Sequence, residues 1–266
     1  MISWLVAAVA LVLLIVGAVR VLEPRIAFFP LVGEDLTPRD LGVAFESVTI
    51  NTADGERLRV WSLPHPDAKA TVIYFHGNGG NLSEWAPILV GVHRHGYAVN
   101  AVDYRGYGAS TGTPTERGLY RDVDAVVRWA LERRSRGIPF VYWGRSLGTT
   151  MAAYAATVAK PDGLIVEAGF PDVRSVVRGS PLAFLALFSS YRFPTASFIA
   201  QARVPSLVMH GDTDSVIPFA VGRELFDSIP DPKQFLTIRG GDHNDREPAD
   251  PAAYWSAVDS FVGSLH

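Results

Sequence analysis

The chain contains no cysteine. Disulfide bonds, thiolate metal ligands and a thiol nucleophile are therefore excluded, although this absence does not identify a cellular compartment. Charge is also sparse, because only 19% of the 266 residues are charged and the formal net charge is -3. A chain so close to neutrality shows no sign of a nucleic-acid-binding surface.

Signatures of metal and phosphate chemistry are missing as well. No H-E-x-x-H motif supplies zinc-ligand spacing, so we expect neither a metal nor a cofactor. The glycine-rich stretch from His76 to Asn81 lacks the Walker lysine and the spacing of a dinucleotide fingerprint, which argues against a phosphate cradle. There is no internal repeat, and 48% of the residues are hydrophobic, enough for the sizeable core of one large domain.

The N-terminus carries an uncharged run from Ile2 to Val19, which Arg20 closes. As a helix this run would span about 27 Å, close to the bilayer's hydrocarbon core of about 30 Å. A cleaved signal peptide and a buried helix of a soluble protein remain as alternatives. No Lys or Arg precedes the run, so we expect an uncleaved single-pass membrane anchor over residues 1–22. Arg20 and Arg25 favour a cytoplasmic position for the rest of the chain.

A linker is expected over residues 23–42, in which Phe28-Phe29 either meets the membrane interface or covers the following domain. The domain itself is expected over residues 43–266. It begins with two strand patterns, 45–52 and 56–63, joined across a hairpin turn signal at Ala53-Asp54-Gly55.

Strand-like and helix-like segments then alternate to the end of the chain. The expected strands are 70–75, 97–102, 140–143, 163–167, 206–210 and 235–238, and the expected helices are 85–95, 116–134, 146–159, 220–229 and 252–265. An antiparallel start followed by repeated strand–helix units predicts an α/β fold, with a mostly parallel sheet covered by helices on both faces.

One connection, Phe170 to Arg203, is longer than a simple crossover needs. It contains the apolar segment 181–188. The segment is either an ordinary crossover helix with a buried loop or a short apolar cap over a substrate site. We expect the cap, with substrate contacts from Phe184, Phe188 and Tyr191.

The pentapeptide Gly144-Arg145-Ser146-Leu147-Gly148 follows one expected strand and precedes a run of small and apolar residues. Strand, G-x-S-x-G and helix is the context of a nucleophile elbow, a tight turn that holds a serine in a strained conformation. The flanking glycines remove side chains that would collide across the turn. We therefore expect Ser146 to be a nucleophile.

A serine nucleophile needs a general base, and the base needs an orienting acid. On this topology the chain order is serine, acid, histidine. His243 stands in a polar turn after the last expected strand, at the sheet edge where open α/β folds bind ligands. His266 is also late enough, but as the terminal residue it is a poor candidate. We expect His243 to be the base.

Three carboxylates are candidates for the acid. Asp212 and Asp214 follow the strand that ends at His210, and Glu167 ends the strand after the elbow. We favour Asp214, because Asp212 is closer to the strand and suits a hydrogen bond within the turn. Glu167 would serve only in a variant arrangement.

Acyl transfer also requires hydrogen-bond donors for the oxyanion. We expect the backbone N–H of Leu147, directly after the nucleophile, to be one donor. The loop after the central strand should supply the other from the Asn78 N–H, because its glycines let the backbone approach a substrate. His76, Asp103 and Arg105 are expected to be structural residues of neighbouring loops.

Five motifs occur in order along the chain: H-G-N-G-G-N, D-Y-R-G-Y-G, G-R-S-L-G, H-G-D-T-D-x-x-I-P and G-D-H-N-D. On these motifs residues 43–265 resemble the alpha/beta-hydrolase superfamily, and the chain looks most like its membrane-anchored branch of alpha/beta-hydrolase-domain serine hydrolases. This branch includes protein depalmitoylases. The resemblance implies Ser146, Asp214 and His243 as a catalytic triad. The depalmitoylating relatives carry a lipidated, cysteine-rich N-terminus, whereas this chain has a hydrophobic helix and no cysteine.

Together these features predict a serine hydrolase that cleaves carboxylic esters or thioesters through an acyl-enzyme. The expected substrate is a small-molecule or lipid-like acyl ester or thioester, or an acylated protein. A serine aminopeptidase or amidase is an alternative. Such peptidases carry larger caps with acidic residues, whereas Asp172 is the only acidic residue in the segment 170–203. A non-catalytic, membrane-anchored binding module on the same fold is the other alternative.

Overall fold

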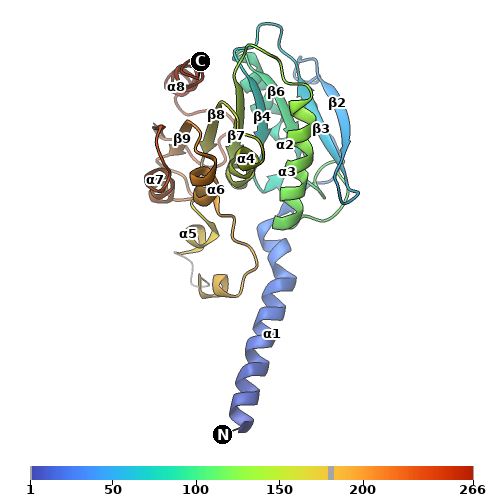
Figure 1. The fold of residues 1–266 in the computed structure, drawn as a ribbon, viewed down its shortest axis with the longest axis vertical. Coiled ribbons are helices and arrows are strands. Elements are labelled where there is room, and N and C mark those ends of the chain that lie inside the picture. The colour runs from blue at the N-terminus through green and yellow to red at the C-terminus, as the bar shows by residue number, and fades with distance from the viewer. Residues whose placement is uncertain (1, 179–182, 266) are drawn as a thin grey trace.

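The computed structural model describes residues 2–178 and 183–265, and shows a long N-terminal helix that projects from an α/β body (Figure 1). Of the expectations above, the first residue of the anchor, Pro181 and Leu182 of the apolar segment, and His266 lie outside the described residues.

An eight-stranded sheet forms the centre of the body, in the order β10-β9-β8-β7-β4-β6-β3-β2. The strands are β2 (Glu46–Asn51), β3 (Arg57–Leu63), β4 (Thr71–Phe75), β6 (Ala98–Val102), β7 (Phe140–Arg145), β8 (Gly163–Glu167), β9 (Ser206–Gly211) and β10 (Lys233–Ile238). β2 and β3 form an antiparallel hairpin and β3 joins β6 antiparallel, whereas the pairs from β6 to β10 are parallel. The predicted mostly parallel sheet with an antiparallel start is confirmed.

Helices cover both faces of this sheet (Figure 1). The helices are α2 (Leu82–Arg94), α3 (Glu116–Leu131), α4 (Leu147–Val158), α6 (Thr195–Ala202), α7 (Phe219–Ser228) and α8 (Pro251–Gly263). Side chains of α3, α4, α6 and α7 form one hydrophobic cluster, and side chains of α2 and α8 form a second cluster with the opposite face. The strands β4, β7, β8 and β9 are buried along their whole length, which explains their continuous apolar sequences.

The N-terminal helix α1 (Ile2–Ala27) continues through residues 23–27, where we expected a linker to begin. By length and composition, Trp4–Ala27 is able to cross a membrane. Phe28 is buried against Tyr191 and Phe193, so this aromatic residue covers the domain, while Phe29 is exposed. The two-residue strand β1 (Phe29–Pro30) then pairs in parallel with β5 (Gly79–Gly80).

The long connection after β8 contains α5 (Val173–Val177) and the 3-10 helix η1 (Ala183–Leu187), and it leads into α6. Its part near residue 190 lies beside the C-terminal end of α1 (Figure 1), because Ser190 donates hydrogen bonds to the Glu23 carboxylate. A second carboxylate, Glu116 of α3, accepts hydrogen bonds from the backbone N–H groups of Arg192 and Phe193. The connection is thus tied to α1 on one side and to the body on the other.

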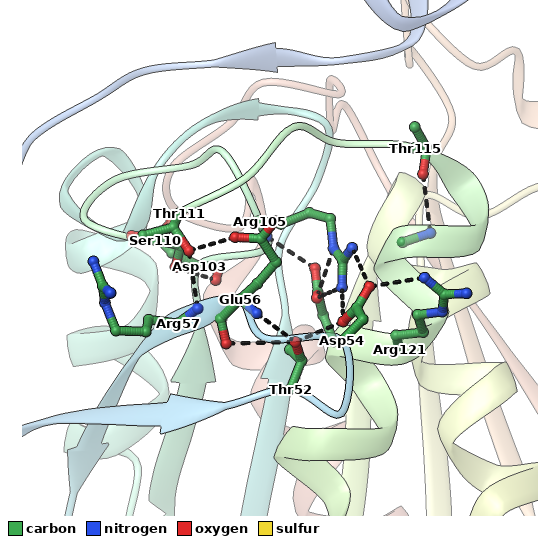
Figure 2. Close-up of polar contacts among 12 residues, drawn as sticks. Thr52, Asp54, Glu56, Arg57, Asp103, Arg105, Ser110, Thr111, Thr115 and Arg121 are labelled. Carbon is green, nitrogen blue, oxygen red and sulfur yellow. Dashed lines mark hydrogen bonds and ion pairs between the residues drawn. The ribbon is translucent and has the colours of Figure 1, made fainter.

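The loop after β6 is fixed by an ion-pair network around Arg105 (Figure 2). Arg105 Nε donates to Asp122 on α3 at 2.9 Å, and its terminal nitrogens donate to Asp54 in the β2–β3 turn at 2.9 and 3.0 Å. Burial raises the pKa of Asp122 to about 6, against the opposing effect of Arg105. The hydrogen bond from Arg105 lowers the pKa of Asp54. Arg105 therefore joins the hairpin turn, the loop and α3.

Replacing Arg105 with methionine is expected to lower the free energy of unfolding by about 3–5 kcal/mol, because Asp122 would be left buried without its cation. Arg121 donates to the same Asp54 carboxylate, but its side chain is 47% exposed. The matched Arg121→Met variant should therefore cost less than about 1 kcal/mol. Denaturant unfolding of both variants in detergent measures the difference, and equal losses would show that the buried Asp122 contact is not the stabilising one.

Candidate active site

Ser146 lies at the carboxyl edge of the sheet, between the end of β7 and the start of α4. Its backbone has φ 55 and ψ -124, a region that non-glycine residues rarely adopt and that costs free energy. The turn is held on both sides: Ser146 N–H donates to the Glu167 carbonyl at 2.9 Å, and Thr149 Oγ1 donates to the Ser146 carbonyl at 2.6 Å. The surrounding fold thus holds Ser146 in this strained conformation at the edge of the sheet.

The glycines on either side of Ser146 are required by close backbone contacts. A Cβ atom on Gly144 would lie 2.2 Å from the Gly148 carbonyl oxygen, and a Cβ on Gly148 would lie 1.9 Å from the Phe75 carbonyl oxygen. The small residues of α4 permit the same close packing, since Ala152, Ala153 and Ala155 are buried. These contacts agree with the expectation that the two glycines remove side chains that would collide across the turn.

Ser146, His243 and Asp214 form a continuous hydrogen-bonded chain. Ser146 Oγ lies 3.0 Å from His243 Nε2, and His243 Nδ1 lies 2.8 Å from Asp214 Oδ2. An ionised carboxylate only accepts hydrogen bonds, so Nδ1 carries the proton and Nε2 is free to accept the serine proton. The three side chains follow β7, β9 and β10, strands that run parallel and therefore end at one edge of the sheet.

Asp214 is held as a carboxylate by its surroundings. Its side chain is almost fully buried, and Oδ1 accepts the backbone N–H groups of Val216 at 2.9 Å and Ile217 at 2.7 Å. Burial alone would raise the pKa of Asp214, but the hydrogen bonds from His243 and from these two N–H groups lower it below its usual value. An acid that stays ionised is suited to stabilise an imidazolium.

The two other carboxylates have different partners. Asp212 Oδ1 accepts the Gly240 N–H at 2.7 Å, which is a bond to the loop after β10 and not the bond within its own turn that we expected. Glu167 Oε2 accepts hydrogen bonds from Trp143 Nε1 at 3.1 Å and from Tyr254 OH at 2.9 Å. Within residues 2–178 and 183–265, neither carboxylate bonds to His243, so Asp214 is the acid that the structure brings to the histidine.

Two residues that were not assigned from the sequence hold the loop after β10 in place. This loop carries His243, and we call it the histidine loop. The buried Arg145 donates to the carbonyl of His243 at 2.8 Å and to the carbonyl of Asp245 at 2.7 Å. Asp242 Oδ1 accepts the Ser215 N–H at 2.7 Å and so connects the loops that carry the base and the acid. The sequence indicates that Arg145, a cation at the end of an otherwise apolar strand, needs buried acceptors, but it does not indicate which acceptors.

The expected oxyanion donors lie beside Ser146. Leu147 is the first residue of α4, and N–H groups in the first turn of a helix have no partner within the helix. Asn78 is fixed by its carbonyl, which accepts Phe29 N–H at 2.9 Å and Tyr107 OH at 2.8 Å. Both residues line a cavity together with Ser146. Their role as donors remains a prediction.

His76 belongs to the packing beneath this loop. It is fully buried, its Nδ1 lies 2.7 Å from the Gly77 carbonyl oxygen, and its Nε2 lies 3.5 Å from Asp103. Its ring packs on Tyr104, with centroids 4.4 Å apart. These contacts agree with the structural role expected for His76.

Two cavities meet at Ser146. The first, of about 430 Å³, is apolar and lies between α1 and the connection that contains α5, so we call it the acyl-side cavity. The second, of about 340 Å³, has a mixed lining that includes charged residues and is bounded by α2 and the histidine loop, and we call it the polar cavity. Ser146 and Asn78 line both cavities.

The three expected cap residues occupy different positions. Tyr191 lines the acyl-side cavity, together with Phe170 and Phe193. Phe184 is 54% exposed, and neither it nor the half-buried Phe188 is among the residues that line this cavity in the described part of the chain. A substrate contact by each of the three remains a prediction.

A mostly parallel eight-stranded sheet covered by helices, with a strained serine between one strand and the next helix, is the arrangement of an alpha/beta hydrolase. The family model for the alpha/beta hydrolase fold matches residues 70–164. The chain is 31% identical over 246 residues to the uncharacterized protein MT2364 of Mycobacterium tuberculosis, covering 90% of this chain and 87% of that protein. It is 31% identical over 212 residues to the human alpha/beta hydrolase domain-containing protein 17B, covering 77% of this chain and 71% of the human protein.

Among solved structures, the esterase Pf2001 of Pyrococcus furiosus has a similar fold, with a TM-score of 0.72 and 21% sequence identity, covering 90% of this chain and 97% of the esterase. The chain therefore belongs to the alpha/beta-hydrolase superfamily, in its branch of alpha/beta-hydrolase-domain proteins. The membership predicted from the five motifs is confirmed. These relationships support a hydrolase activity.

Proposed function

We propose that the protein is a serine hydrolase that cleaves carboxylic ester or thioester bonds through Ser146, His243 and Asp214. The observation that carries this proposal is the chain of contacts from Ser146 Oγ to His243 Nε2, at 3.0 Å, and from His243 Nδ1 to Asp214 Oδ2, at 2.8 Å. The strained turn at Ser146 and its position between two cavities support the same conclusion.

In this mechanism Ser146 Oγ attacks the substrate carbonyl carbon while His243 Nε2 takes the serine proton. The N–H groups of Leu147 and Asn78 stabilise the negative charge that develops on the carbonyl oxygen. His243 then returns the proton to the leaving alcohol or thiol, and an acyl-enzyme remains on Ser146. Water, deprotonated by the same imidazole, releases the carboxylic acid. Asp214 stays ionised and holds the imidazole in the required tautomer.

The two cavities suggest how a substrate is placed. The apolar lining of the acyl-side cavity suits a hydrocarbon chain, and the polar cavity, with Glu84 and Arg246 in its wall, suits a polar leaving group. The substrate proposed here is accordingly an acyl ester or thioester of lipid-like character.

We further propose that α1 is a retained single-pass anchor over residues 1–22, followed by a hydrolase domain over residues 43–266 with residues 170–203 as its cap. Arg20 and Arg25 lie in the C-terminal part of α1, after its uncharged run, and favour a cytoplasmic domain. The hydrogen bonds from Ser190 to Glu23 support retention, since cleavage before Glu23 would separate the helix from the end that packs on the domain.

The proposed nucleophile is tested by labelling the full-length protein in detergent with an alkyl fluorophosphonate. In the wild-type protein Ser146 Oγ should displace fluoride from the probe and carry the phosphonyl group, which mass spectrometry detects. The Ser146→Ala variant should not be labelled. Ser264→Ala, at the C-terminal end of α8, is the matched control and should be labelled like the wild type. A folded wild-type protein that resists the probe would refute the mechanism.

Hydrolysis of matched esters, thioesters and amides of one acyl group then defines the reaction. We expect the ester or the thioester to be the best substrate by kcat/KM. A higher value for the amide would replace the esterase proposal with an amidase.

A further inference from the structure

One face of α1 forms part of the wall that leads to Ser146. The residues that line the acyl-side cavity from this helix are Val19, Leu22, Glu23, Ile26 and Ala27. Their spacing of three and four places them on a single face of the helix. Val21, between them in the sequence, is 68% exposed and is not among the described residues that line the cavity. The anchor helix thus has a cavity-facing side and an opposite, outward side.

The opposite wall belongs to the connection after β8, and the two walls are fastened together. Val173, Val176 and Tyr191 line the cavity from this connection. The buried Glu23 carboxylate accepts hydrogen bonds from both the N–H and the hydroxyl of Ser190. Phe28 packs edge-to-face on Tyr191, with ring centroids 5.6 Å apart. The cavity is therefore built by contacts between α1 and the cap.

Apolar side chains extend from the cavity to the outer surface along α1. Leu22 and Ile26 line the cavity and are still 46% and 69% exposed. The uncharged run Ile2–Val19 is long enough to cross most of a hydrocarbon core of about 30 Å, and Leu22 and Ile26 follow it within about one and two helical turns. Leu22 and Ile26 thus lie near the level at which lipid acyl chains meet the headgroups. Exposed apolar side chains at that level face lipid at little cost in free energy.

We propose that the last two turns of α1 are one wall of an acyl-chain groove, through which a membrane-resident acyl ester slides its chain from the bilayer to Ser146. This inference rests on the proposed hydrolase function and names its substrate class. The ester group reaches Ser146 while the acyl chain lies between α1 and the cap and the leaving group occupies the polar cavity. Val19 lies at the lipid end of the groove, and Leu22 is the next lining residue along α1, so the size of the Leu22 side chain limits the chain that binds.

The groove is tested with two tryptophan variants of the full-length protein in the same detergent micelles. Leu22→Trp narrows the groove, and Val21→Trp adds the same side chain at the same depth on the outward face. The readout is the ratio of kcat/KM for p-nitrophenyl palmitate to kcat/KM for p-nitrophenyl butyrate. We expect Leu22→Trp to lower this ratio about tenfold or more, because each CH₂ group excluded from apolar contact weakens binding about fourfold. Val21→Trp should leave both rates unchanged.

Each other result has a defined meaning. An unchanged ratio in Leu22→Trp, or an equal decrease of the ratio in Val21→Trp, would overturn the groove. Absence of ester hydrolysis and of fluorophosphonate labelling in the folded wild type would instead overturn the proposed function itself. The two failures are therefore distinguishable.

A second measurement on the wild-type protein does not depend on a variant that folds. A long-chain alkyl fluorophosphonate with a diazirine at the end of its chain is attached to Ser146 and then irradiated. We expect crosslinks in residues 19–27 of α1, located by mass spectrometry. Crosslinks confined to α2 around Glu84 or to the loop at residues 243–246 would place the chain in the polar cavity and would overturn the proposal.

Discussion

Alanine at Ser146, alanine at His243 and both substitutions together are each expected to lower kcat for ester hydrolysis by about the same factor, on the order of 10⁶. The two side chains act in one step, because His243 Nε2 lies 3.0 Å from Ser146 Oγ and removes its proton during attack. Once either is lost, the other has no reaction to assist. Steady-state kinetics on p-nitrophenyl butyrate measure all three variants. If the double variant were slower than either single variant by the product of their effects, the two residues would not act as a unit.

The acid should contribute less than the other two residues. Asp214→Asn is expected to lower kcat about 10⁴-fold, since asparagine offers its amide to Nδ1, favours the wrong imidazole tautomer and cannot balance the imidazolium charge. Asp212→Asn is the matched control. It keeps an oxygen for the Gly240 N–H, so kcat should change by less than about tenfold. The reverse order of effects would assign the acid to Asp212.

The second large effect concerns the turn that carries the nucleophile. Gly148→Ala is expected to lower the free energy of unfolding by more than about 3 kcal/mol, because the added Cβ would lie 1.9 Å from the Phe75 carbonyl oxygen. Phe75 is buried at the end of β4 and α4 packs directly on the sheet, so neither backbone segment has room to move. We expect the variant to unfold at much lower temperature or to fail to accumulate as folded protein.

Gly91→Ala is the control for this substitution. Gly91 lies within α2, and among the described residues a Cβ atom built on it meets nothing within 4 Å. Alanine should stabilise the helix there by up to about 1 kcal/mol. Thermal unfolding in detergent, followed by circular dichroism, compares the two glycines. A Gly148→Ala variant as stable as the wild type would mean that the contact between α4 and β4 is not rigid.

Much of the fold and the core of the site could be predicted because their signals are local. Continuous apolar runs mark the buried parallel strands, and Ser146 and Asp214 each follow such a strand within a few residues. His243 follows the partly buried edge strand β10. Parallel strands of one sheet end at the same edge, so three positions far apart in the chain converge without further information. The family membership was predicted from the same motifs and is confirmed by the human alpha/beta hydrolase domain-containing relative.

The parts that could not be predicted depend on contacts between distant segments. Arg145 holds the carbonyl of His243, 98 residues away, and Glu23 accepts a hydrogen bond from Ser190, 167 residues away. No sequence pattern in these segments indicates which distant residue each of them contacts. The orientation of Phe184 has the same difficulty, because a short, wholly apolar segment does not reveal which of its faces is covered. The strand Gly79–Gly80 was not predicted, because two glycines carry no strand preference.

The pairing of β1 with β5 has a practical consequence for preparing a soluble form of the enzyme. Phe29 N–H donates to the Asn78 carbonyl at 2.9 Å, Leu31 N–H donates to the Gly80 carbonyl at 2.9 Å, and Asn81 Nδ2 donates to the Gly33 carbonyl at 2.9 Å. A polypeptide that starts at residue 43 would leave the Asn78 loop without these bonds, whereas one that starts at Phe28 keeps them. The useful cut lies between Ala27 and Phe28, well before the first strand of the large sheet.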